Sequence, residues 1–502
     1  MTYLTIQTDD LPAVQAAIER EFRLDELLRL VPDTGQAPDA DALLISNNAI
    51  DLLPDWSGLL PPVLLPRPLP VTPDALLAVV FSRLDNWEKA YEYARHDRSL
   101  ADALDLTNRL QLGVPVPVPV RPHNGTGTFE AYQRWHNRAV ALHYGNPDGT
   151  GADELEQAYS AALKTAPDAE HHAFTAKHYA TLLLDTGQLS EADAVLEEAI
   201  GTPDAGGSLP AWHYELLAVQ SGVWLQQLTV PYDSGLLDRT KTALWQVLQH
   251  YETQEQPLQV ALLLVDAAQV ANFQNSFAES LGYISRAISI FREEDVTELL
   301  ANAQYRKGVL LYTWAQQGSP QFYRPAMEAY QEALKVFSQQ NAPAVFAEIQ
   351  HHLGVIYAEI PDEVKKKSIW AAVSSSSFQQ ALAYFTREDF PYEYATICNH
   401  YANALTKYPL ALRSDNYAKA IGYYRDALRV RTAEQYPYER ALTILNYLEA
   451  GWYVGEDDLQ NQRALLKDLL QKADEVQQLV ADEGLIQEAE THCLRLRELV
   501  LE

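Results

Sequence analysis

A recurring spacing of aromatic, proline and small residues organises the second half of the chain. It is clearest at residues 385–405, where Phe385 is followed by Pro391, Ala395 and Ala402 at intervals of six, four and seven residues. The frame starts again at residues 251, 291, 337 and 431, so that the five starts are 40, 46, 48 and 46 residues apart. The other copies are Tyr251, Pro257, Ala261, Ala268; Phe291, Thr297, Ala301, Gly308; Phe337, Pro343, Ala347, Gly354; and Arg431, Pro437, Ala441, Leu448. Such a period is typical of helical repeat arrays, so we expect one long array rather than several globular domains.

Helical periodicity begins near residue 74 and continues in pairs of helices. The stretch 74–97 places Leu77, Ala78 and Phe81 on one predicted helix. A turn at Asp85 and Asn86 follows, and a second predicted helix then carries Trp87, Ala90 and Ala94. Apolar residues spaced in this way form one face of each helix, so the stretch is interpreted as a first helix pair.

The N-terminal region reads differently. Residues 1–53 predict one or two helices after a short possible strand, with an apolar helical face made of Ile18, Phe22, Leu24, Leu27 and Leu28. Residues 54–73 contain seven prolines and so cannot be the interior of a helix. We expect an extended connector there, and a ligand for a proline-binding module is the alternative.

A second proline-rich run, residues 114–122, predicts another extended segment, because alternating Val and Pro suits neither a helix nor a central strand. Residues 456–502 predict two polar helices broken at Asp482–Gly484. Their polar density suits a cap that ends the array in water. The chain is therefore divided into an N-terminal helical region and connector (1–73), a repeat array (74–455) and C-terminal capping helices (456–502).

The stretch 176–204 resembles the tetratricopeptide repeat (TPR) family. Tyr179 and Ala180 stand at its large-then-small pair, Gly187 at its tight turn, and Pro203 at the close of the unit. Its second helix carries a small–large–small stripe that recurs twice, as Ala192, Leu196, Ala199; Ala326, Tyr330, Ala333; and Ala420, Tyr424, Ala427. The resemblance covers residues 74–455 and implies an all-α, right-handed superhelical solenoid of about eight or nine antiparallel helix pairs.

The later units are longer than usual because material is inserted between the two helices of a pair. The insertions fall at 228–237, 316–325, 361–377 and 407–417, and because all occupy the same turn we expect them along one edge of the array. The frame with its insertions is similar to the extended repeats that bacteria place beside CHAT-type peptidase domains. No such catalytic domain occurs in this chain.

The charge of the chain limits the kinds of partner that it is expected to bind. The net charge of -30 opposes binding to nucleic acid and to anionic membranes, and mildly favours basic or apolar partners. The sequence contains no run of roughly 20 apolar residues, which is the length needed to cross a bilayer. The start of the chain is acidic rather than signal-like, and only Cys398 and Cys493 are present, which favours the cytoplasm.

The sequence lacks the motifs of the common enzyme classes. The sequence contains no P-loop, HExxH pair, GxSxG elbow or spaced cysteine cluster, so we expect a non-enzymatic protein without a cofactor or a bound metal. Residues 146–157 resemble part of a calcium loop, but Gln157 replaces the bidentate Glu, and a helix connection capped by Asp153 is favoured. The histidine pairs at 171–172 and 351–352, with His178 and His400, lack chelating spacing and are interpreted as core or groove residues.

Two sets of residues are candidates for contact with a partner. In the TPR family the first helix of each pair lines the concave groove, and projecting that register gives Lys177, Tyr305, Arg306, His351, Asn399 and Asn403. Asn399 and Asn403 lie four apart and are expected to hydrogen-bond the backbone of an extended peptide. The second set is a basic loop next to an aromatic residue, formed by Lys365, Lys366, Lys367 and Trp370.

The sequence thus predicts an interaction scaffold that binds a protein or peptide in its groove or along the inserted edge, with homo-oligomers possible. The alternative is a regulatory or sensor subunit that controls a separately encoded effector, such as a CHAT-type peptidase, or that binds a small molecule.

Overall fold

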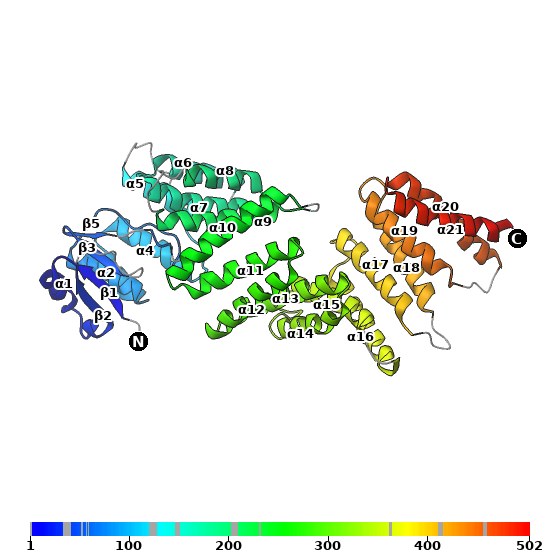
Figure 1. Cartoon of the computed structure of the whole chain (residues 1–502). Coiled ribbons are helices and arrows are strands. Elements are labelled where there is room, and N and C mark those ends of the chain that lie inside the picture. Colours follow the sequence, from blue (N-terminus) through cyan, green and yellow to red (C-terminus); the bar gives the residue numbers. More distant parts are fainter. Residues whose placement is uncertain are drawn as a thin grey trace. The chain divides into compact units, whose positions relative to one another are not determined.

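A computed structural model describes residues 3–33, 42–51, 54–56, 58, 60–119, 128–145, 151–201, 209–229, 232–360, 364–409, 415–454 and 459–501. It divides into two compact units, Met1–His250 and Tyr251–Glu502, which we call unit 1 and unit 2. Each unit is considered by itself (Figure 1).

Unit 1 begins with a five-stranded sheet. Its strands and first helices are β1 (Leu4–Thr8), α1 (Leu11–Ile18), a 3-10 turn (Leu24–Leu27), β2 (Leu28–Pro32), β3 (Leu43–Ser46), β4 (Ala49–Asp51) and β5 (Leu69–Pro70). The strand order is β2-β1-β3-β4-β5, with β2 and β3 parallel to β1 and the last two pairings antiparallel. Ile6, Ile45 and Ile50 from three strands are buried under α1 and the following helix α2 (Pro73–Arg83).

The short strand and one helix predicted for residues 1–53 are present as β1 and α1, but β2, β3 and β4 were not predicted. The predicted helical face does not form, because Phe22 is 91% exposed and Leu27 48% exposed, while Leu28 belongs to β2. The helical spacing of these residues does not correspond to a single helix in the structure. Alternation in LTIQT and LLIS carried the strand signal, but pairings such as Ile6 with Leu43 join distant residues and cannot be read locally.

The remainder of unit 1 is helical. After α2 come α3 (Trp87–Ala94), α4 (Arg98–Gln111), α5 (Phe129–Gly145), α6 (Ala152–Thr165), α7 (Ala169–Asp185), α8 (Leu189–Ile200), α9 (Ala211–Gln227) and α10 (Ser234–Thr253), which crosses into unit 2. The predicted turns are confirmed, since Asp85 and Gly187 both have positive φ. Residues 61–66 and 114–119 have neither helix nor strand, as their prolines predicted. Asp153 lies in the first turn of α6 and not at its cap, which is Gly151, and residues 146–150 of the calcium-like stretch lie outside the described residues.

Unit 2 is a series of helix pairs. They are α11 (Pro257–Phe273), α12 (Phe277–Glu293), α13 (Thr297–Gln316), a 3-10 turn (Pro320–Phe322), α14 (Tyr323–Ala333), α15 (Pro343–Glu359), α16 (Val364–Tyr384), α17 (Pro391–Lys407), α18 (Asn416–Val430), α19 (Pro437–Gly451), α20 (Leu459–Leu479) and α21 (Glu483–Leu501). Consecutive helices pack on one another. The first helix of each pair from α11 to α19 begins at the frame residue that the sequence indicated, which confirms the repeat frame and the helical array. The final two helices also lie where they were predicted.

Small residues on the first helix make room for rings on the second. A Cβ atom at Gly308 would lie 2.7 Å from the ring of Tyr330, and one at Gly354 would lie 2.9 Å from the ring of Phe378. Both rings are fully buried. The small–large packing that the repeat frame implied is therefore present in successive pairs.

The predicted insertions differ in outcome. Those at 316–325 and 407–417 fall between the helices of a pair, as expected, and 228–237 spans the connection from α9 to the start of α10. The insertion at 361–377 was expected to be a loop, and this was wrong, because residues from Val364 onward belong to α16, a helix of 21 residues. The sequence AAVSSSS permits a helix once Ser374 donates to the Gly354 carbonyl at 2.5 Å and so satisfies its buried hydroxyl.

Candidate peptide-binding surface

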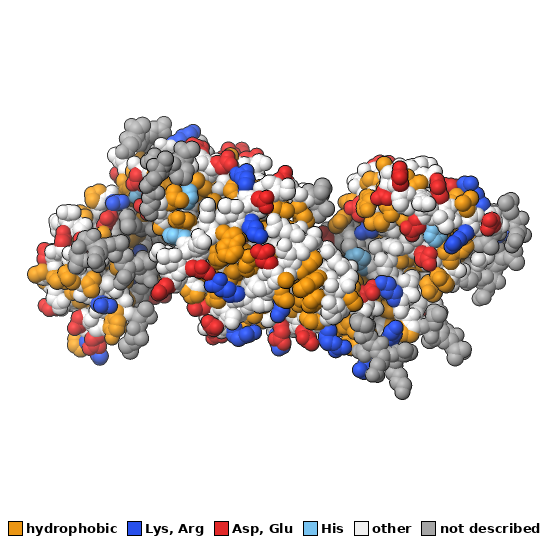
Figure 2. Space-filling view, in the orientation of Figure 1, with side chains coloured by type: hydrophobic (Ala, Val, Ile, Leu, Met, Phe, Trp, Pro, Cys, Tyr) orange, Lys and Arg blue, Asp and Glu red, His pale blue; other side chains and the backbone are white. Residues whose placement is uncertain are grey.

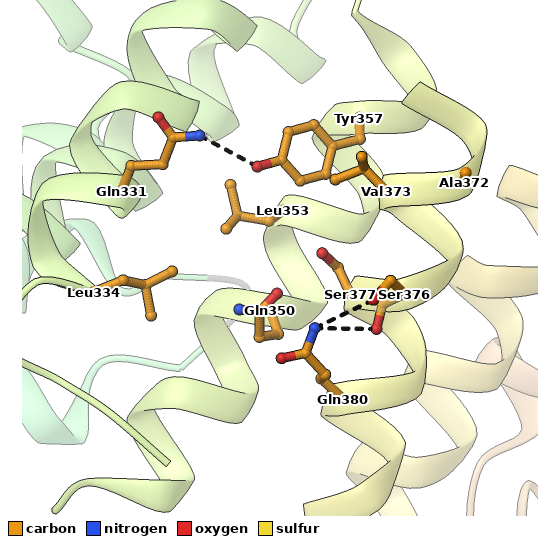
Figure 3. A pocket seen from close by; sticks show the side chains of 10 residues that line it. All are labelled: Gln331, Leu334, Gln350, Leu353, Tyr357, Ala372, Val373, Ser376, Ser377 and Gln380. Carbon is orange, nitrogen blue, oxygen red and sulfur yellow. Dashed lines mark hydrogen bonds between the residues drawn. The ribbon is translucent and has the colours of Figure 1, made fainter. Parts of the chain in front are cut away.

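A cavity opens between α14 and α16, with α15 as its floor. Its volume is about 430 Å³. Gln331 and Leu334 form one wall, and residues of α16 form the other (Figure 3). The lining residues are Gln331, Leu334, Gln350, Leu353, Tyr357, Ala372, Val373, Ser376, Ser377 and Gln380. We call this cavity the α16 slot.

Among the described residues that line the slot, Tyr357 alone has an ionisable side chain. Gln331 donates from Nε2 to the Tyr357 hydroxyl at 3.3 Å, and Gln380 donates from Nε2 to the hydroxyl and carbonyl oxygens of Ser376 at 3.4 Å each. The Gln350 side chain lies between them on the floor (Figure 3). Side-chain amides offer both a donor and an acceptor, which is the pairing that a peptide backbone or another amide requires.

One face of α16 extends the slot. Ile369, Val373, Ser377 and Gln380 recur at helical spacing, so they share that face. Ile369 is 62% exposed and Val373 37% exposed, so two apolar side chains one helical turn apart lie on this face, and we call them the strip. Strip and slot together form the α16 surface.

The basic residues that were predicted as a loop contact lie at the start of the same helix. Lys366 and Lys367 are exposed, and Lys365 belongs to the first turn. Trp370 turns away from the strip and stacks on Tyr357, with ring centroids 5.5 Å apart and planes 9° apart. It thereby positions Tyr357 at the end of the slot instead of standing free for a partner.

Three of the predicted groove residues of unit 2 bond to side chains on the neighbouring first helices. Arg306 donates from Nη1 to Gln269 Oε1 at 3.3 Å, which joins α13 to α11. Tyr305 hydrogen-bonds Glu348, and burial together with that carboxylate raises the pKa of the phenol. His351 Nε2 lies 2.8 Å from His400 Nδ1. These contacts form a ladder along the first helices, so much of their polar capacity is already used inside the fold.

Asn399 and Asn403 do not present two accessible amides. Asn399 is buried, with an Oδ1 that accepts no hydrogen bond from the described residues. Asn403 Oδ1 accepts from the Tyr424 hydroxyl at 2.6 Å, which fixes α17 to α18. Local spacing could not show that Asn399 is buried or that Tyr424 takes the Asn403 oxygen.

Lys177 lies in unit 1. Its Nζ donates to Glu215 Oε2 at 2.8 Å, joining α7 to α9, and sits 5.6 Å from the ring centroid of Trp56. The ring of Trp56 meets Phe174 edge-on at 5.2 Å. The predicted groove position therefore belongs to an aromatic cluster that contacts the N-terminal connector.

Two of the histidines singled out from the sequence contact side chains within the fold. His171 Nδ1 lies 2.8 Å from Asp168 Oδ1 at the start of α7, and His178 Nδ1 lies 3.0 Å from the Tyr144 hydroxyl. Within the described residues no group of three or more His, Cys, Asp or Glu side chains could hold a metal ion. None of the described helices is both long enough and apolar enough to cross a membrane.

Charge is spread over the surface. Acidic side chains are scattered over the visible face among hydrophobic ones, and basic side chains occur singly or in small groups (Figure 2). The whole chain carries a net charge of -30. The uncharged α16 slot is therefore an exception in its electrostatic character.

The sequence reasoning missed the slot. Its residues come from three helices, and the glutamines Gln331 and Gln350 carry no motif. The available signal was the spacing of Ile369, Val373, Ser377 and Gln380, which the serine run and the assumed loop obscured.

Comparisons with known proteins give shape-level likenesses only. No family model matches the chain, and no curated protein matches it. The apo form of the quorum sensor NprR from B. thuringiensis is 14% identical with a TM-score of 0.44, covering 74% of this chain and 96% of that chain. The human IFIT1 dimer with PPP-AAAA is 14% identical with a TM-score of 0.34, covering 86% of this chain and 83% of that chain.

A third solved structure, the APC/C hetero-tetramer Cut9-Hcn1, is 13% identical with a TM-score of 0.32, covering 86% of this chain and 76% of that chain. Scores and identities this low assign neither a family nor a function. Function is therefore argued from the residues of the chain itself.

Proposed function

We propose that this protein is a non-enzymatic helical-repeat scaffold, and that unit 2 binds an uncharged segment of a partner protein along the α16 surface. The observation that carries the proposal is the α16 slot, an uncharged, amide-lined cavity of about 430 Å³ beside the exposed Ile369 and Val373. The apolar strip supplies area, and the glutamines and serines supply hydrogen bonds that fix orientation.

The charge of the chain favours this kind of partner. An acidic peptide would be repelled by the net charge of -30, whereas a neutral segment enters the slot without desolvating an unpaired charge. The lysines at the start of α16 lie beyond the strip and are proposed to contact the end of the bound segment.

The ladder along the first helices supports the choice of surface. Arg306, His351 and Asn403 already bond to neighbouring side chains, so a peptide in that groove would have to break those contacts. In the α16 slot, the described side-chain hydrogen bonds of Gln331 and Gln380 are weak, at 3.3 to 3.4 Å.

The test compares two substitutions at equally exposed positions. Val373→Arg puts a charge at the mouth of the slot, where Val373 is 37% exposed, and Leu262→Arg puts one on α11, where Leu262 is 39% exposed. The full-length chain and both variants are used to capture partners from the native cell. We expect Val373→Arg to weaken the partner by about tenfold or more and Leu262→Arg to leave it unchanged. A partner retained equally by both variants contradicts the α16 assignment.

The alternative function, a sensor or a subunit that regulates a separate effector such as a CHAT-type peptidase, uses the same scaffold. A cavity of this volume also suits a small molecule. Thermal shift against a panel of neutral metabolites separates the two, because only a small-molecule site raises the melting temperature without a protein partner. Co-purification with the product of a neighbouring gene would favour the effector version.

A further inference from the structure

Unit 1 holds a short extended segment of its own chain as if it were a bound peptide. Residues 61–66, PPVLLP, leave the sheet after β4 and return to it at β5. We call this segment the strap. Between those points it crosses α5 and α7, and each of its residues is buried or half-buried.

Three side chains of α5 bind the strap backbone. Asn137 Oδ1 accepts from the Leu64 amide at 2.9 Å, and Asn137 Nδ2 donates to the Leu64 carbonyl at 2.8 Å. Gln133 Nε2 donates to the same carbonyl at 3.0 Å. His136 Nε2 lies 2.8 Å from the Pro62 carbonyl, which can only accept, so this nitrogen carries the proton.

The side chain of Leu64 fills an aromatic pocket. It is 4% exposed and packs with Tyr132 of α5 and Phe174 of α7, with Trp56 and Phe129 at the margin. We call α5 and α7 with this pocket the cradle. One leucine is thus selected by shape, while the backbone on either side is recognised independently of sequence.

This arrangement has the chemistry of peptide recognition. Prolines at 61, 62 and 66 have no N–H group, and the Val63 amide bonds within the strap to the Pro61 carbonyl at 2.7 Å. The prolines fix φ at their positions, and the Val63–Pro61 hydrogen bond closes a tight three-residue turn at Pro62, so the strap is restricted before binding and the entropy cost of capture is lower. Helix-borne amide side chains then satisfy the central residue, as they would for any extended segment.

We propose that the cradle is a second binding site, one that the strap occupies in cis, and that it accepts in trans an extended partner segment carrying a leucine flanked by prolines. This site is separate from the α16 surface and does not depend on it. The tethered strap competes at an effective concentration on the order of millimolar, so the free cradle is exposed only when the strap is released.

A purely structural tie is the competing reading. Val63 packs with Leu106 and Val116, and Leu65 packs against the N-terminal core, so the strap also joins neighbouring clusters. The two readings differ in whether the cradle binds a peptide once Leu64 is withdrawn.

The experiment uses the full-length chain and a labelled nonapeptide that copies residues 60–68. Leu64→Ala withdraws the strap's anchor, and Leu112→Ala, at an exposed leucine of the same unit, is the matched control. Fluorescence anisotropy should show weak binding to the wild type and to Leu112→Ala, and binding at least about tenfold tighter to Leu64→Ala. Adding Asn137→Ala to Leu64→Ala should reduce affinity about tenfold, because two hydrogen bonds to the peptide are lost.

A second measurement keeps the test decisive if Leu64→Ala does not fold. Hydrogen exchange at the Leu64 amide of the wild type should speed up when excess peptide displaces the strap. No peptide binding by folded Leu64→Ala, together with unchanged exchange in the wild type, overturns the proposal. A dimer of Leu64→Ala in light scattering that binds no peptide also overturns it, because the cradle would then be covered by a second copy instead of accepting a peptide.

Discussion

Asn137 and Leu64, 73 residues apart in the sequence, are joined by two hydrogen bonds that connect a helix side chain to both backbone groups of one strap residue. Both partners are buried. The contact ties the connector to α5, and its removal leaves the Leu64 amide without an acceptor.

Asn137→Ala should therefore destabilise unit 1 by about 1–3 kcal/mol, because a buried N–H loses its partner while the Leu64 carbonyl keeps Gln133. Urea unfolding with hydrogen exchange of α5 as the local probe measures this. Gln111→Ala, at the exposed end of α4, is the control and should change little. Equal losses in both variants would mean that the contact contributes nothing to stability.

Gly308→Ala should destabilise unit 2 by about 1–3 kcal/mol, because its new methyl group would meet the buried Tyr330 ring at 2.7 Å. Gly282→Ala in α12 meets no atom within 4 Å and should be neutral or stabilising by up to about 1 kcal/mol through helix propensity. Thermal unfolding of the two variants compares them directly. A stable Gly308→Ala would show that the helices of this pair can separate without cost.

Acid should weaken the fold through its buried histidines. Burial lowers the pKa of His136, His352 and His400 to about 4 from an ordinary value of 6.5. Between those values the unfolded chain binds more protons than the folded one, so stability is full above pH 6.5 and falls as the pH drops toward 4. For the fully buried His136 the loss amounts to about 3 kcal/mol at most.

The measurement is the unfolding midpoint at a series of pH values in this range. His136→Gln should flatten the dependence, whereas the same change at the exposed His96 should leave it as in the wild type. A wild-type midpoint that does not fall between neutral pH and pH about 5 would contradict the neutral, buried state of these rings.

Asp266 should have the opposite effect. Burial raises the pKa of its carboxyl group to about 6, with Arg306 opposing the rise. Above that pH the carboxylate is charged in both states, and water in the unfolded state solvates it better. As the pH falls from about 6 toward the ordinary value of 3.8, the folded state binds the proton first and is stabilised relative to the unfolded state. Asp266→Asn should raise the melting temperature at neutral pH and lose this advantage in acid. The exposed Glu434→Gln serves as the control, and a lower melting temperature for Asp266→Asn at neutral pH would contradict the argument.

The sequence predicted much of the fold of unit 2 and little of the α16 surface proposed to bind a partner. Pro343 and Pro391 mark the starts of first helices, and Gly354 marks the contact with Phe378, because each signal lies within one repeat and its neighbour. The α16 slot needed three helices to meet, and the length of α16 was hidden by a serine run that resembles a loop.

The sequence by itself determined the array of helix pairs, the turns at Asp85 and Gly187, and the extended proline runs, since these follow from local backbone preference and from contacts between adjacent repeats. Only the tertiary structure decided that the N-terminus forms a sheet, that Asn403 bonds Tyr424 instead of facing an open groove, and that Asn137 holds the strap. Those contacts join residues far apart in the chain. Which of the available partners each polar group takes depends on how the surrounding helices and strands pack, and no local pattern encodes that choice.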